Sequence, residues 1–132
     1  MSRAPRGAVV IVTDGGMTHI HLWVSDMERS VGFYSSVFGM TERFRHGARL
    51  VSLSTPGAKD SISLNWDPAD ERPKGAMGTI AHFGFRPSDP GDLDRAVEEV
   101  LAAGGSLVER GQQGEGRQYA YVADPDGYLI EL

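Results

Sequence analysis

Three widely spaced residues of this chain have side chains that bind divalent metals: His19, His82 and Glu131. Two imidazoles and one carboxylate on one side of a metal suit non-haem Fe(II) best, and also Mn, Co, Ni or Zn. Such a set leaves the opposite coordination positions open, so an oxygen-rich substrate, alone or with dioxygen, can coordinate and be polarised. The sequence therefore raises the hypothesis of a mononuclear metal site, provided that the fold brings the three segments together.

Glu131 lies in the closing hairpin of the chain. Apolar and aromatic residues flank the turn sequence Asp124-Pro125-Asp126-Gly127, which is typical of two short strands joined by a tight turn. Side chains alternate between the two faces of a strand, so the apolar neighbours of Glu131 pack on one side while Glu131 points to the other. A carboxylate in such a strand needs a cation or a metal as its partner.

The two histidines occupy equivalent places in an internal repeat. His19 and His82 each lie seven residues before an aspartate, Asp26 and Asp89, and a serine precedes each aspartate. A Glu-Arg pair also follows soon after the glycine that ends each predicted helix. Coincidences at offsets of 63 to 67 residues indicate a duplicated unit.

The elements that must position these residues follow the same order in both halves, a strand, a helix and three strands. Period-two and helical patterns, together with glycine and proline breaks, give their bounds. The first half is predicted to contain a strand over Thr18–Val24, a helix over Met27–Phe38, and strands over Glu42–His46, Arg49–Ser54 and Ser61–Trp66. The second is predicted to contain a strand from Thr79, a helix over Leu93–Ala103, and strands over Ser106–Arg110, Gln118–Ala123 and Tyr128–Leu132.

These elements predict one domain over residues 17–132, made of a module 17–66, a linker 67–78 and a module 79–132. Residues 1–16 form either an added edge strand or a loosely docked leader.

Several further side chains are candidates for roles near the metal. His21 shares a strand face with His19, and Tyr119 and Tyr121 share a face of the strand that precedes the closing turn, where each is a candidate proton donor. Packing with a satisfied hydroxyl is an equally good interpretation of the tyrosines. Trp23 and Trp66 either belong to the core or line a pocket for an aromatic ligand.

Composition excludes several classes of function. The net charge of −5 and the absence of a basic patch argue against nucleic-acid binding, and no apolar run is long enough to span a membrane. Cysteine is absent, which removes disulfides, thiolate ligands and a cysteine nucleophile. Since no stretch reads as a signal peptide, we expect a cytoplasmic protein with a small-molecule substrate.

Residues 18–40, 80–85 and 121–132 resemble the vicinal oxygen chelate superfamily, the group of glyoxalase I, bleomycin-resistance proteins, fosfomycin-resistance transferases and extradiol dioxygenases. The resemblance covers the chain from Thr18 to the end. It implies an α+β fold in which two βαβββ modules pair into a cup-shaped mixed sheet. It also implies that His19, His82 and Glu131 stand at the metal-ligand positions.

Two departures bear on the reaction. Where glyoxalase I-like members have a second Glu ligand, this chain has Ser63, whose hydroxyl is a poor ligand and no base near neutral pH, so Ser63 is left as a substrate-binding candidate. The tail matches the extradiol dioxygenase signature at Tyr121, at the Asp-Pro and Gly of the turn, and at Glu131. That signature also has a histidine upstream, which residues 112–114 lack, and His21 is the candidate substitute.

On this basis we expect a metalloenzyme that cleaves an aromatic ring oxidatively. A metal-dependent lyase or isomerase of glyoxalase type is the first alternative, and a non-catalytic protein that sequesters an antibiotic is the second. We expect a homodimer, and the modules that share a metal belong either to one chain or to two.

Overall fold

The computed structural model describes residues 17–75, 80–87 and 90–132. Its first half contains β1 (Ile20–Trp23), α1 (Met27–Phe38), β2 (Thr41–His46), β3 (Leu50–Ser54) and β4 (Ile62–Asn65). Its second half contains β5 (Phe83–Gly84), a short 3₁₀ turn (Pro90–Asp92), α2 (Leu93–Ala102), β6 (Ser106–Gln113), β7 (Arg117–Ala123) and β8 (Leu129–Glu131).

The two halves have the same sheet topology. The sheet of the first half has the order β1-β4-β3-β2, and that of the second has the order β5-β8-β7-β6. In each, the first strand runs parallel to the last and the other neighbours are antiparallel. The structure thus confirms the predicted α+β fold of two βαβββ modules.

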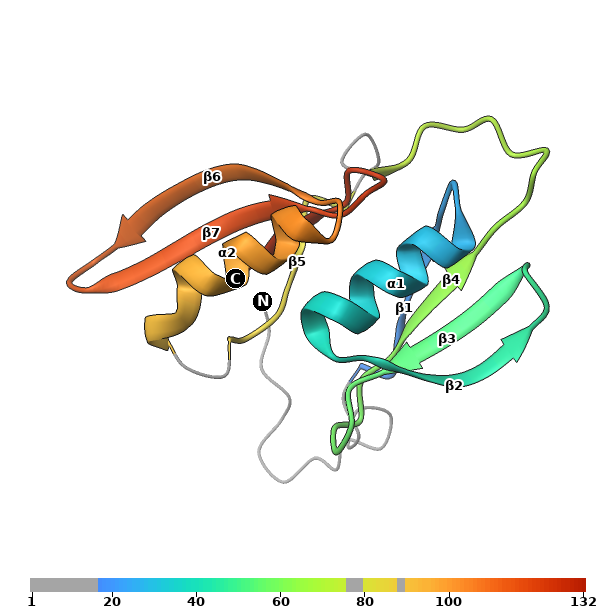
Figure 1. The fold of residues 1–132 in the computed structure, drawn as a ribbon, viewed down its shortest axis with the longest axis horizontal. Coiled ribbons are helices and arrows are strands. Elements are labelled where there is room, and N and C mark those ends of the chain that lie inside the picture. The colour runs from blue at the N-terminus through green and yellow to red at the C-terminus, as the bar shows by residue number, and fades with distance from the viewer. Residues whose placement is uncertain (1–16, 76–79, 88–89) are drawn as a thin grey trace, which may run out of the picture.

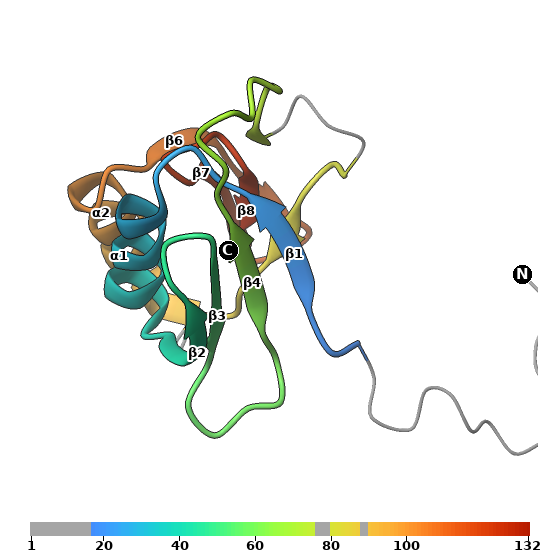
Figure 2. The ribbon, with the colours of Figure 1, turned by 90° about the vertical axis from the view of Figure 1, so that its right-hand side faces the viewer.

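Both helices lie on the same side of the two sheets, as Figures 1 and 2 show from two directions. They cover the sheet faces that carry the apolar side chains, and α1 packs against α2. The other face of each sheet, here called the open face, carries the polar side chains of the alternating strands. His21 and Trp23 are exposed there while Leu22 between them is buried.

One hydrophobic core joins the two modules. Phe33 and Tyr34 of α1 are fully buried together with Val122 and Ile130 of the second sheet. Phe38, at the end of α1, stacks on Phe85 with ring centroids 3.8 Å apart. Burial of each large apolar side chain contributes about 1.5–3 kcal/mol, so the modules are held together chiefly by this shared core.

Local sequence signals account for the ends of α1. The Asp26 carboxylate accepts a hydrogen bond from the backbone N–H of Arg29 at 3.0 Å, which caps the N-terminus. Gly39 takes a left-handed conformation with φ of 66°, and its N–H bonds back to the last turn. The helix therefore spans the predicted residues, whereas Asp89, the predicted counterpart of Asp26, lies outside the described residues.

The closing turn is clamped to α1 by two buried carboxylates. Asp124 accepts a hydrogen bond from the Tyr34 hydroxyl at 2.7 Å, and its other oxygen accepts the N–H groups of Asp126 and Tyr128 at 2.9 Å. Asp126 accepts hydrogen bonds from three groups at the start of α1: the N–H of Ser25, the Ser30 hydroxyl and the Arg29 guanidinium. Gly127 has the predicted positive φ, at 93°.

The strand predicted from Thr79 and the segment 1–16 differ from the expected elements or lie outside the described residues. The strand predicted from Thr79 is much shorter in the described residues, because only Phe83 and Gly84 pair with β8. The proposed edge strand or leader at residues 1–16 lies outside the described part of the chain. In that part no helix is long and apolar enough to cross a membrane.

Candidate metal centre

The closing hairpin brings three of the predicted site residues together. Glu131 of β8 lies between Gly84 of β5 and Tyr121 of β7 in the sheet, and His82 precedes β5 on the same open face. The Oε1 oxygen of the Glu131 carboxylate lies 3.2 Å from Nε2 of His82. The same oxygen accepts a hydrogen bond from the Tyr121 hydroxyl at 2.9 Å. His82 and Tyr121 also meet edge to face, with ring centroids 5.0 Å apart.

Tyr121 is held in its protonated form. The hydrogen bond to the Glu131 carboxylate raises the pKa of the Tyr121 hydroxyl, and desolvation adds to the effect. A phenol that stays protonated near neutral pH can donate a hydrogen bond or a proton and cannot act as a base. The role of Tyr121 as a proton donor stays a prediction.

Tyr119 extends the same face of β7. Its ring meets that of Tyr121 edge to face at 5.6 Å, and it lies across Gly111 of β6. A Cβ at position 111 would stand 2.5 Å from the Tyr119 hydroxyl oxygen, so glycine is required for this ring to lie flat on the sheet. The two predicted tyrosines thus form one aromatic wall beside Glu131.

The geometry of His82 and Glu131 fits two neighbouring ligands of one metal. Bonds of about 2.1 Å from a metal to nitrogen and oxygen at a right angle place the two donor atoms about 3 Å apart. The observed Nε2–Oε1 separation is 3.2 Å, and both side chains are about one-third exposed, so the pair is accessible. These two residues therefore have the spacing of two metal ligands, and they are here called the candidate half-site.

The first module carries residues at the equivalent positions. In the parallel pair of the first sheet, His21 lies opposite Ser63. At the equivalent place in the second sheet, Gly84 lies opposite Glu131. Ser63 therefore stands in the place of Glu131, and His19, two residues before His21, stands in the place of His82. The structural repeat supports the sequence argument that Ser63 replaces a second carboxylate.

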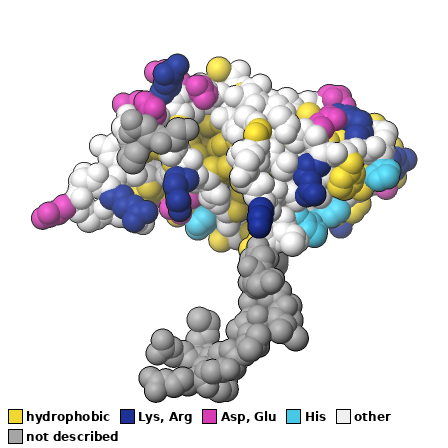
Figure 3. Space-filling view, turned by 90° about the horizontal axis from the view of Figure 1, so that it is seen from below, with side chains coloured by type: hydrophobic (Ala, Val, Ile, Leu, Met, Phe, Trp, Pro, Cys, Tyr) yellow, Lys and Arg dark blue, Asp and Glu magenta, His cyan; other side chains and the backbone are white. Residues whose placement is uncertain are grey.

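The two halves do not meet within this chain. In the described residues, no group of three or more His, Asp or Glu side chains converges on a point that could hold a metal. His19 is exposed, and its Nδ1 lies 2.9 Å from the hydroxyl of Thr18. Figure 3 shows histidine side chains at separate positions on the face seen from below. The predicted convergence of all three ligands thus stays a prediction.

A wide groove runs over the open face of the second module. Its volume is about 1180 Å³, above the usual range for a small-molecule site, and both His82 and Glu131 line it. Arg86 and Arg117 also line it, and neither makes an ion pair with a described residue. Sequence reasoning missed both arginines, because only the strand pairing shows that they border the same groove.

A smaller pocket of about 180 Å³ lies between β1 and the β5–β8 edge. Its lining includes both His21 and His82, and Trp23 forms part of the wall. Trp23 therefore lines a pocket, and its substrate-binding role stays a prediction. Trp66 is instead packed against the core, with the Arg49 guanidinium 5.8 Å from its ring centroid.

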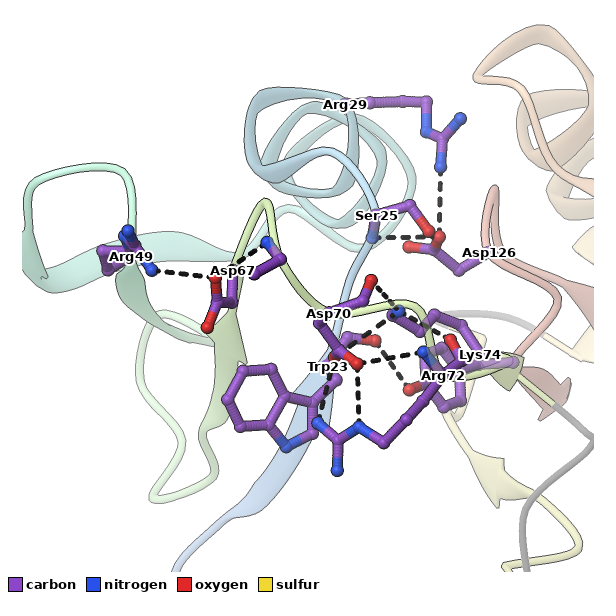
Figure 4. Close-up of polar contacts among 11 residues, drawn as sticks. Trp23, Ser25, Arg29, Arg49, Asp67, Asp70, Arg72, Lys74 and Asp126 are labelled. Carbon is purple, nitrogen blue, oxygen red and sulfur yellow. Dashed lines mark hydrogen bonds and ion pairs between the residues drawn. The ribbon is translucent and has the colours of Figure 1, made fainter.

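Arg72 of the linker packs on the exposed ring of Trp23. The Arg72 guanidinium lies 4.8 Å from the Trp23 ring centroid, and Asp70 accepts two hydrogen bonds from it, at 2.8 and 2.9 Å (Figure 4). This pairing lowers the pKa of the Asp70 carboxyl. Farther along the linker, Gly75 packs so tightly on the backbone of Gly127 that a Cβ there would stand 2.5 Å away. The Arg72 guanidinium therefore covers one face of the Trp23 indole.

The sheet topology and the paired modules define a known class of protein. Residues 16–132 match the Glyoxalase/Bleomycin resistance protein/Dioxygenase superfamily, and the chain belongs to this family. It is 34% identical to a probable lactoylglutathione lyase from Vibrio cholerae over 86% of each chain, and 28% identical to a lactoylglutathione lyase from Salmonella typhimurium over 88% of this chain and 90% of the relative.

Solved structures share the fold. The fosfomycin resistance protein FosX from Listeria monocytogenes superposes with a TM-score of 0.71 at 21% identity, over 89% of this chain and 91% of that one. A family enzyme from Burkholderia phytofirmans superposes with a TM-score of 0.70 at 19% identity, over 86% and 94%. These structures share the fold, and the family match over residues 16–132 confirms the predicted membership of the superfamily.

The expected reaction needs revision. The relatives and structures named above are described as lyases, a resistance protein and a family enzyme, and they give no support to ring cleavage in particular. The glyoxalase-type alternative fits them better. The tail signature that favoured ring cleavage consists largely of Asp124, Gly127 and Glu131, and the first two have a structural role in the turn clamped to α1.

Proposed function

We propose that this protein is a metal-dependent enzyme of glyoxalase type, a lyase or isomerase that acts on a small oxygen-bearing substrate. The observation that carries the proposal is the contact of His82 with Glu131, which has the spacing of two metal ligands and lies beside a protonated tyrosine. The names of the relatives support lyase chemistry rather than oxidation.

In this proposal His19, His82 and Glu131 hold one divalent metal, with Fe(II), Mn, Co, Ni and Zn as candidates. When bound, the metal supplies Lewis-acid polarisation of the substrate oxygens. Tyr121 orients the Glu131 carboxylate through its hydrogen bond, in the way that outer partners fix metal ligands. Tyr121 has one hydroxyl hydrogen, so it donates to a substrate oxygen that gains negative charge only when it releases Glu131.

The groove over the second module suits a substrate larger than the reacting group alone. Its exposed cations, Arg86 and Arg117, match carboxylates carried at a distance from the reacting atoms. Lactoylglutathione, the compound in the names of the relatives, carries such carboxylates, so we propose it as the first substrate to assay. Ser63 in place of a second carboxylate favours a related substrate if lactoylglutathione fails.

Metal titration tests this function and separates it from a sequestering role without catalysis. Metal-free protein, titrated with Fe(II), Mn(II), Ni(II) and Zn(II), is expected to bind at least one of them with a Kd well below 1 mM, an affinity of about 4 kcal/mol. His82→Ala is expected to weaken binding at least about tenfold, because a ligand is lost. His46→Ala, at the exposed end of β2, is the matched control.

Two results would contradict the proposal. Wild-type protein that binds none of the metals better than about 1 mM has no such centre. Oxygen uptake with a panel of catechols, with no turnover of lactoylglutathione or related thioesters, would restore the ring-cleavage hypothesis.

We further propose that the site is shared between two chains, because within one chain His19 does not join His82 and Glu131. A dimer would then place the first module of one copy against the second module of the other. Mixing variants tests this arrangement. His19→Ala and His82→Ala are each expected to be inactive alone.

After mixing under conditions that exchange subunits, the heterodimer is expected to regain one intact site of two and about half the specific activity of a wild-type dimer. A sample of His19→Ala alone, treated in the same way, is the control, because none of its chains has His19. If wild-type protein is active as a monomer, or the mixture stays inactive although exchange is verified, the modules that share the metal belong to one chain.

A further inference from the structure

A second histidine on the open face of the first sheet has an unusual partner. Nε2 of His21, on β1, makes a hydrogen bond with Oδ1 of Asn65, on β4. The two residues are diagonal neighbours in the parallel pair, since His21 lies opposite Ser63 and Trp23 lies opposite Asn65. Alternation along each strand puts both side chains on the open face, away from the core.

The orientation of the Asn65 amide is fixed independently. Its nitrogen Nδ2 donates a hydrogen bond to the backbone carbonyl of Arg49 at 3.2 Å. A carbonyl oxygen can only accept, so the NH₂ group must face Arg49 and the Oδ1 oxygen must face His21. Only a ring nitrogen that carries hydrogen can satisfy that oxygen. In the neutral imidazole the proton is therefore on Nε2, and Nδ1 keeps its lone pair.

The pocket beside His21 has few polar side chains. Of the described residues that line it, only His21, His82, Trp23 and Tyr128 carry polar side-chain atoms, and the other walls are aliphatic, aromatic or glycine. The Tyr128 hydroxyl is already engaged with the backbone carbonyl of Trp23 at 2.7 Å, and His82 is paired with Glu131. In this tautomer Nδ1 of His21 is a hydrogen-bond acceptor that no described residue engages.

We propose that Asn65 is a positioning residue that holds His21 as its Nε2-protonated tautomer, so that Nδ1 accepts a hydrogen bond from a hydroxyl group of the substrate in the pocket between β1 and β5. The ligand class is a small molecule with a hydroxyl next to a carbonyl, which the pocket volume of about 180 Å³ can hold. The choice of ligand rests on the proposed function, and the tautomer does not.

Nitrogen NMR of the metal-free full chain, labelled with ¹⁵N-histidine and recorded at alkaline pH, tests the tautomer directly. Wild-type His21, assigned by its absence in His21→Gln, is expected to show a protonated-type signal at Nε2 and an unprotonated-type signal at Nδ1. In Asn65→Ala both signals move towards the average of the two tautomers. Asn65→Asp, whose carboxylate also accepts, restores the wild-type pattern, and Ser54→Ala on the open face of β3 leaves it unchanged.

Binding of two matched probes tests the role of Nδ1. Hydroxyacetone has a hydroxyl beside its carbonyl, and methoxyacetone has the same frame without a donor. Hydroxyacetone is expected to shift the Nδ1 signal. It is expected to bind about twofold more weakly to Asn65→Ala, because an averaged imidazole has an unprotonated Nδ1 about half of the time. Methoxyacetone is expected to bind both proteins equally and to leave Nδ1 in place.

A wild-type His21 protonated on Nδ1 or averaged between tautomers overturns the proposal. So does an Asn65→Ala variant, verified as folded by circular dichroism, that binds hydroxyacetone as wild type does. Because these readouts need neither metal nor turnover, they can fail while the metal centre stands, and the metal titration can fail while they hold.

Discussion

Replacing Glu131 with glutamine is expected to abolish metal binding, with the Kd raised at least about 100-fold, or nearly 3 kcal/mol. The substitution keeps the shape of the side chain and exchanges a carboxylate for a neutral amide, which is a weak ligand. His82 then remains as the only ligand of its half-site. Since Glu131 is about one-third exposed and lies outside the core, the metal-free variant should unfold at nearly the same temperature as wild type.

Tyr121→Phe is the informative companion to Glu131→Gln. It removes only the hydroxyl that donates to Oε1 of Glu131, so metal affinity should fall by about tenfold, the usual effect of losing an outer partner of a ligand. Isothermal titration of both variants with the best metal measures the difference. Glu131→Gln that binds metal as wild type does would remove Glu131 from the ligand set.

The largest effect on stability is expected from Tyr34→Phe, which should lower the free energy of unfolding by about 1–3 kcal/mol at neutral pH. The Tyr34 hydroxyl is fully buried and donates to Asp124, which is 3% exposed. Phenylalanine preserves the packing of α1 but leaves a carboxylate oxygen buried without this donor. The clamp between α1 and the closing turn is weakened with it.

Chemical denaturation measures this loss, with Tyr119→Phe as the control. The Tyr119 hydroxyl makes no hydrogen bond with the described residues of the chain, so its removal should cost no more than about 0.5 kcal/mol. An equal loss in the two variants would show that the Tyr34 hydroxyl has no special role in the clamp.

The effect of Tyr34→Phe should depend on pH. Burial raises the pKa of Asp124, and the hydrogen bond from Tyr34 opposes that rise. A carboxyl whose pKa is raised on folding binds its proton more tightly in the folded state, so its charged form costs stability above that pKa. Loss of the Tyr34 donor raises the pKa further. The deficit should therefore be largest at neutral pH and shrink as the pH falls towards the ordinary carboxyl value of about 4.

The same buried pair raises the pKa of the Tyr34 hydroxyl well above its ordinary value, first through burial and then through the charge of Asp124. The Tyr34 hydroxyl therefore stays protonated, and remains a hydrogen-bond donor, at both neutral and mildly acidic pH. Unfolding measured at neutral and at mildly acidic pH compares the two regimes. A deficit that grows on acidification would contradict the assignment.

Local patterns were sufficient for most of the secondary structure. The aspartate cap and the terminal glycine define α1, and period-two alternation defines the faces of β1 and β8, because these signals depend on neighbours along the chain. The strand predicted from Thr79 is shorter because β5 pairs through only two residues with β8. Pairing of that kind depends on a partner far away in the sequence.

By itself, the sequence determined the duplicated βαβββ units, the family and the equivalence of His19 with His82, because spacing and alternation carry that information. Only the tertiary structure decided which of these side chains meet. Parallel pairing of β5 with β8 brings His82 to Glu131, and pairing of β1 with β4 brings His21 to Asn65. The packing of α1 between the modules gives Asp124 and Asp126 a structural role. Contacts of this kind join residues that are many positions apart, so only the packed chain creates them.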